Sequence, residues 1–119
     1  MRRLFLMLIC LLVPVVALAG EFVHPLEFSG EESEKAQVIR FIQANVKAQY
    51  SAIGMDDPLT LRMMEKEELK SFKALMNVKD RALLDRVIAQ YCGIGMCNYN
   101  TILMMYKEQK KASGDALTW

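Results

Sequence analysis

Cys92 and Cys97 are the residues of this sequence whose type and spacing best support chemistry. The chain has three cysteines, and the third, Cys10, lies in an apolar N-terminal stretch. The Cys-x4-Cys spacing differs from the Cys-x-x-Cys spacing that is typical of thiol redox sites. We therefore expect a structural disulfide between Cys92 and Cys97, and a thiol-redox role is a less favoured alternative.

His24 is the only histidine of the chain. Because no partner group lies near it in the sequence, we interpret it as a partly exposed loop residue rather than a metal ligand or a catalytic base. The sequence contains neither a His-Glu-x-x-His motif nor a glycine-rich phosphate loop. No set of catalytic residues stands out, so we expect that the protein is not an enzyme and that it has no cofactor.

Methionine is unusually frequent, with nine residues in the chain. Thioether sulfur is a ligand of Cu(I), so a periplasmic copper-binding protein is our alternative function. Most of these methionines fall on predicted apolar faces or in turns, where packing is their commoner role. The seven that follow the N-terminal stretch are Met55, Met63, Met64, Met76, Met96, Met104 and Met105.

One turn sequence occurs twice, at an offset of 41 residues. Aligned without gaps, residues 40–67 and 81–108 are identical at 13 of 28 positions. A repeat of about forty residues fits a helix-pair unit, so the sequence predicts a duplicated αα-hairpin. Each turn should contain a glycine with positive φ and a methionine that contacts a tyrosine of the preceding helix. The turn-defining residues are Tyr50, Gly54 and Met55 in the first copy and Tyr91, Gly95 and Met96 in the second.

Apolar residues recur at the helical period on both sides of each turn, and no segment has the alternation of a strand. We expect an all-α, four-helix domain over residues 31–112, with repeat units of about 31–71 and 72–112. Residues 20–30 should form an extended N-terminal arm, and residues 113–119 a C-terminal tail.

The first helix is expected to begin at a capping box formed by Ser29 and Glu32. The other three helices should cover about 58–76, 79–92 and 99–112. The predicted buried face of the first helix consists of Ile39, Ile42, Val46, Tyr50 and Ile53.

Residues 1–19 have the three parts of a secretory signal peptide. Arg2 and Arg3 form a basic start, an apolar stretch follows, and Ala17-Leu18-Ala19 matches a cleavage site. We expect cleavage there, export to the periplasm in preference to the extracellular space, and no stable membrane insertion afterwards. The remaining chain carries 13 basic and 14 acidic residues, which disfavours nucleic-acid binding.

Leu59 and Met63 lie on the face of the second predicted helix that is opposite its apolar stripe. Met104 occupies the position that matches Met63 in the second copy. These residues either complete a second buried face or form an apolar patch for a partner. We interpret the protein as an exported protein-binding module, such as an adaptor, inhibitor or immunity-type protein, whose partner is unidentified.

Overall fold

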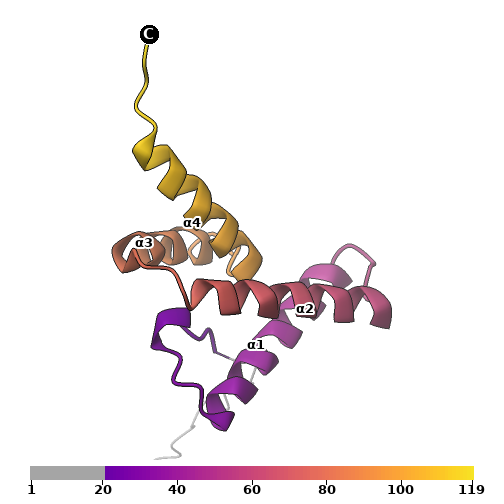
Figure 1. The fold of residues 1–119 in the computed structure, drawn as a ribbon. Helices are drawn as coiled ribbons and strands as arrows, with labels where there is room; N and C mark the ends of the chain where they lie inside the picture. Colours follow the sequence, from indigo (N-terminus) through magenta and orange to yellow (C-terminus); the bar gives the residue numbers. More distant parts are fainter. Residues whose placement is uncertain (1–20) are drawn as a thin grey trace, which may run out of the picture.

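The computed structural model describes residues 21–119, and among these residues there is no strand. The chain forms a 3-10 turn, η1 (Pro25–Glu27), and four helices (Figure 1): α1 (Glu32–Ser51), α2 (Pro58–Leu75), α3 (Arg81–Cys92) and α4 (Tyr99–Gly114). The prediction of an all-α, four-helix fold is therefore confirmed. The predicted signal peptide lies outside the described residues. No helix within residues 21–119 is long and apolar enough to cross a membrane.

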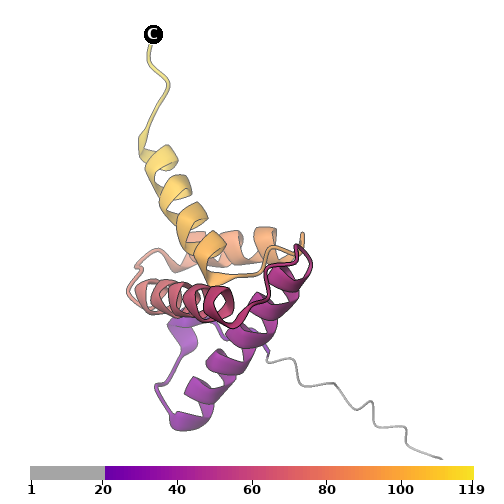
Figure 2. The same cartoon turned by 90° about the vertical axis from the view of Figure 1, so that its right-hand side faces the viewer.

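The helix α2 lies at the centre of the arrangement, where it packs against α1, α4 and η1. The helix α3 packs against α4. The helices cross one another rather than forming a parallel bundle, and the end of α4 runs away from the other helices (Figures 1 and 2). The tail beyond α4 therefore does not cover the core, and Leu117 and Trp119 are fully exposed.

The buried row of α1 consists of Val38, Ile42 and Val46, each at most 3% exposed. The prediction that Ile39 and Ile53 belong to this row is wrong, because they are 46% and 63% exposed. Val38 is four residues before Ile42 and so lies on the same face, whereas Ile39 is rotated by about 100° around the helix. Ile53 lies beyond the end of α1, in the turn. The rest of the apolar core consists of Phe72, Leu75, Leu83, Leu84, Val87, Tyr99, Ile102 and Tyr106.

The N-terminal arm is held against the core by Tyr99. The Tyr99 hydroxyl donates a hydrogen bond to the carbonyl oxygen of Val23 at 2.8 Å and accepts one from its N–H at 3.3 Å. Phe22 stacks on the Tyr99 ring, with the ring centroids 5.3 Å apart. The arm was predicted to be extended, but it is so only in part. Pro25 begins η1, and the His24 side chain caps this turn. Proline is well suited to a first helical position, where its missing N–H is not needed.

The start of α1 is secured by Ser29 and Glu34, so the predicted capping box of Ser29 with Glu32 is wrong. The N–H and the hydroxyl of Ser29 donate to one carboxylate oxygen of Glu34, at 2.6 and 2.7 Å. Glu31 is the N-cap of α1, so Glu34 is the third helical residue, and Gly30, with a φ of 84°, turns the chain between Ser29 and Glu31. These hydrogen bonds hold the pKa of the Glu34 carboxyl below its ordinary value.

The two repeated turns have the same backbone geometry. In each turn the methionine N–H donates to the tyrosine carbonyl at 2.9 Å, which is the outer bond of a Schellman motif. The glycine between them has positive φ, 72° at Gly54 and 80° at Gly95. Superposition of residues 40–67 on residues 81–108 as complete units stays a prediction.

Replacing Gly54 or Gly95 with alanine is expected to lower the free energy of unfolding by about 1 kcal/mol each, because an L-residue is strained at positive φ. A Cβ at either position would meet no atom within 4 Å, so the backbone alone causes the loss. Gly114→Ala is the matched control, since that site is equally open and lacks positive φ. Urea unfolding measures all three variants, and equal stability of Gly95→Ala and wild type would contradict the expectation.

Cys92 and Cys97 form a disulfide across the second turn, with their Cα atoms 4.0 Å apart. In the first turn the equivalent residues are Ser51 and Asp56, and the Ser51 hydroxyl donates to the Asp56 carboxylate at 3.4 Å. The same two positions are therefore joined in both turns, covalently in one and by a long hydrogen bond in the other.

The double variant Cys92→Ser/Cys97→Ser is expected to remain helical but to lose about 1–3 kcal/mol, because the bond closes only a short loop. Circular dichroism melts measure the loss. Ser51→Ala is the matched control in the first turn, and it should cost no more than about 0.5 kcal/mol. Loss of the helical signal at room temperature in the double variant would show that the second turn depends on its disulfide.

Candidate functional site

Two adjoining hollows follow the seam between α1 and α2, with volumes of about 520 and 150 Å³. Both are lined by Ile39 and Leu69, so they adjoin at these residues, and together we call them the α1–α2 groove. The apolar residues of its larger part are Phe28, Val38, Ile39, Leu69, Phe72 and Met76.

The apolar floor of the groove reaches solvent because α1 carries two adjacent apolar rows. Val38 belongs to the row that enters the core, whereas Ile39 lies beside it and is half exposed. On α2, Leu69 lies about one turn before the buried Phe72 and is itself partly buried. Phe28 of the arm closes one end of the groove and packs edge-on against Phe72, with the ring centroids 5.2 Å apart. The arm is therefore part of the groove wall.

The groove has the length of a short helix. Its lining spans residues 35–43 of α1 and residues 62–77 at and beyond α2. At a rise of 1.5 Å per residue these walls are about 12 and 20 Å long, which corresponds to roughly two to four helical turns.

The charged lining of the groove is mainly basic. Lys35 of α1 and Lys73 of α2 stand on the two walls of the larger part, and Arg62, Glu65 and Lys66 line the smaller part. Arg62 and Glu65 pair with each other. Four basic residues and one acidic residue thus line the groove, although the chain from residue 20 onward has slightly more acidic than basic residues.

The predicted contact residues Leu59, Met63 and Met104 do not line this groove. Each is more than half exposed, so they do not form a second buried face. They remain a separate candidate for an apolar contact surface.

The seven methionines within residues 21–119 lie on α2 or at its C-cap, on α4 and in both turns, and five of them are exposed. Within residues 21–119 no group of three His, Cys, Asp or Glu side chains is arranged to hold a metal ion. Copper binding through thioethers stays a prediction, which titration with Cu(I) tests.

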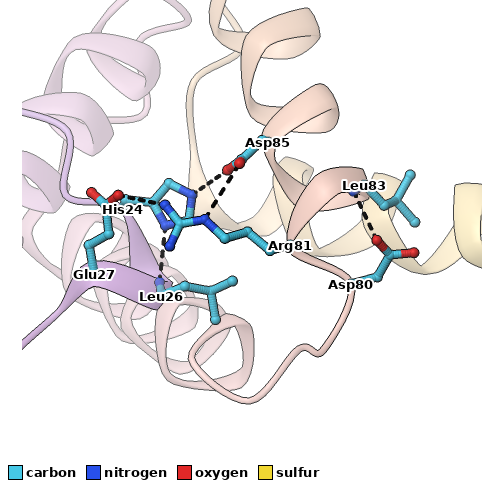
Figure 3. Close-up of polar contacts among 7 residues, drawn as sticks. All are labelled: His24, Leu26, Glu27, Asp80, Arg81, Leu83 and Asp85. Atoms are coloured by element: carbon cyan, nitrogen blue, oxygen red, sulfur yellow. Dashed lines mark hydrogen bonds and ion pairs between the residues drawn. The ribbon is translucent and has the colours of Figure 1, made fainter.

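A charged cluster around His24 joins the arm to α3 (Figure 3). His24 Nε2 lies 2.6 Å from a carboxylate oxygen of Asp85, and its Nδ1 accepts the Leu26 N–H at 3.1 Å. Arg81 bonds to Glu27 at 2.5 Å and lies 3.6 Å from Asp85. The hydrogen bond from His24, aided by the charge of Arg81, holds the pKa of Asp85 below its ordinary value.

The geometry of His24 favours a structural role. Because Nδ1 accepts a hydrogen bond, the neutral ring carries its proton on Nε2, which donates to Asp85. Neither ring nitrogen is left to take a proton from a substrate. His24 is partly exposed and precedes η1, as the sequence predicted, and its partner Asp85 lies 61 positions away in the sequence.

Glu68 is a buried carboxylate that the sequence analysis missed, and it is 6% exposed. Its two oxygens accept the backbone N–H groups of Tyr99 and Asn100, at 2.7 and 3.1 Å. These are the first N–H groups of α4, and Asn98 caps the same helix through the Thr101 N–H. Burial raises the pKa of Glu68, and the two backbone hydrogen bonds oppose this rise. Because each oxygen is paired, Glu68 anchors α4 to α2.

The position of Glu68 in the second predicted helix could have indicated that it is buried. It lies four residues after Met64 and four before Phe72, so it shares a helix face with these two apolar residues. A carboxylate on such a face must be paired when it is buried.

Comparisons with protein-family models, with curated proteins and with solved structures find no match to this chain.

Proposed function

We propose that this protein is an exported protein-binding module and that the α1–α2 groove is its binding surface. The observation that carries the proposal is the apolar floor of a hollow of about 520 Å³ between two helices. Such a groove suits an amphipathic helix, whose apolar side chains enter it at positions i, i+3 or i+4, and i+7. A contiguous apolar surface that remains in contact with water is typical of an interaction site.

The disulfide supports the exported location within this proposal. Disulfides form and persist in oxidising compartments such as the bacterial periplasm and the extracellular space. The Cys92–Cys97 bond therefore agrees with the signal peptide that the sequence predicts.

A display selection of helical peptides on the wild-type protein tests the groove. Peptides selected in this way are expected to bind Ile39→Glu at least tenfold more weakly, because the new carboxylate lies in the apolar floor. Met63→Glu is the matched control, since Met63 is a similarly exposed apolar residue outside the groove. Circular dichroism verifies that both variants fold.

Two outcomes of this selection would contradict the groove as binding surface. One is equal affinity of the selected peptides for wild type and Ile39→Glu. The other is a loss of affinity in Met63→Glu alone, which would place binding on the surface of Leu59 and Met63.

A further inference from the structure

Resting on the groove proposed above, we infer that its partner is an acidic amphipathic helix, with carboxylates on both flanks of an apolar stripe. The charge of the partner follows from the basic residues of the groove, because the apolar floor alone does not determine it.

Lysine side chains lie on both sides of the apolar floor. Lys35 stands on the α1 wall and Lys73 on the α2 wall, so cations lie on both sides of the apolar floor. An occupant in the groove therefore has a basic group on each flank. A helix that places its apolar side chains in the floor would bring the residues beside this stripe close to these lysines.

The lysines that line the groove are available to pair with a partner. Lys66 and Lys73 form no ion pair with any residue that the structure describes. Lys35 pairs with Glu32 at 3.0 Å, but the Glu32 side chain is 90% exposed and lies outside the groove. Exposed pairs of this kind are weak, so a carboxylate of a partner can replace Glu32 at little cost.

The shape of the groove favours a helix over a lipid as its occupant. The comparison is needed because an anionic lipid also combines apolar and acidic groups. The groove has two walls of about 12 and 20 Å and is lined by charges along both of its parts, not at one end only. Charges that are distributed along the α2 wall, with Lys35 opposite them on α1, match a helix with several carboxylates better than a lipid with one headgroup.

Fluorescence anisotropy with two designed peptides tests the inference. Both peptides carry leucines at positions i, i+4, i+7 and i+11, and their flanking positions are all glutamate in one and all lysine in the other. We expect the acidic peptide to bind wild type at least tenfold more tightly, and this preference to weaken as salt is added.

The variant Lys35→Glu/Lys73→Glu is expected to reverse the preference between the peptides. Lys107→Glu/Lys111→Glu is the matched control, because it makes the same change of net charge on exposed residues of α4. It should leave the order of affinities as in wild type. Circular dichroism verifies that each variant folds.

The outcomes separate the two proposals. Equal binding of both peptides, sensitive to Ile39→Glu, would overturn the acidic partner and leave the groove in place. Binding that is insensitive to Ile39→Glu would overturn both. Direct binding to phosphatidylglycerol vesicles that displaces the acidic peptide would assign the groove to a lipid and overturn the acidic helix.

Discussion

Replacing Tyr99 with alanine is expected to lower the free energy of unfolding by about 4 kcal/mol, which is a large fraction of the stability of a small domain. Tyr99 is 0% exposed. Its ring contacts three other aromatic rings, with centroids 5.3 Å from Phe22, 5.5 Å from Phe41 and 4.9 Å from Phe72. Alanine would leave a cavity where the arm, α1, α2 and α4 meet. Chemical denaturation followed by circular dichroism measures the loss.

Tyr99→Phe separates the ring from the hydroxyl. Phenylalanine keeps the aromatic contacts but removes the hydroxyl that bonds to both backbone groups of Val23. We expect a loss of about 1 kcal/mol, because one donor and one acceptor are left without a partner. If this variant loses as much stability as Tyr99→Ala, the arm hydrogen bonds rather than the ring contacts dominate.

Replacing Glu68 with alanine is expected to cost about 3 kcal/mol. The change leaves the N–H groups of Tyr99 and Asn100 without their acceptors at a buried helix start, and each unpaired buried donor costs about 1–3 kcal/mol. Glu67→Ala is the matched control, because Glu67 is the neighbouring residue and its side chain is exposed. It should change stability by no more than about 0.5 kcal/mol. Similar losses in both variants would contradict the anchoring role of Glu68.

The pH dependence of stability gives a second test of the burial of the Glu68 carboxyl. Because burial raises its pKa in the folded state, the native protein binds more protons than the unfolded chain between the ordinary and the raised pKa. This contribution to stability is present at low pH and is lost as pH rises through the raised pKa. The stability of wild type relative to Glu68→Gln should therefore fall over the range of pH that begins near the ordinary carboxyl pKa of about 4 and ends above the raised pKa. A rise over that range would show that the two backbone hydrogen bonds outweigh burial.

The features that depend on neighbouring residues could be predicted from the sequence. The positive φ of Gly54 and Gly95 follows from the way a helix ends, and the pairing of Cys92 with Cys97 follows from their spacing across that turn. The four helices follow from apolar periodicity in the same way. All of these arise from interactions within a few residues along the chain.

The features that depend on packing could not be predicted in this way. The choice between Val38 and Ile39 as the buried residue depends on where α2 contacts α1, which periodicity alone does not determine. The pair of His24 with Asp85 joins residues 61 positions apart. The groove has the same origin, because it exists where Ile39 and Leu69 are left uncovered by the crossing of two helices.

The measurement that tests the groove most directly is a map of amide chemical-shift changes on the isotopically labelled protein during titration with the acidic peptide. The account predicts that the shifts concentrate around Ile39, Leu69 and Met76, which line the α1–α2 groove. Shifts centred instead on Leu59, Met63 or Met104 would contradict it, because these residues lie outside the groove.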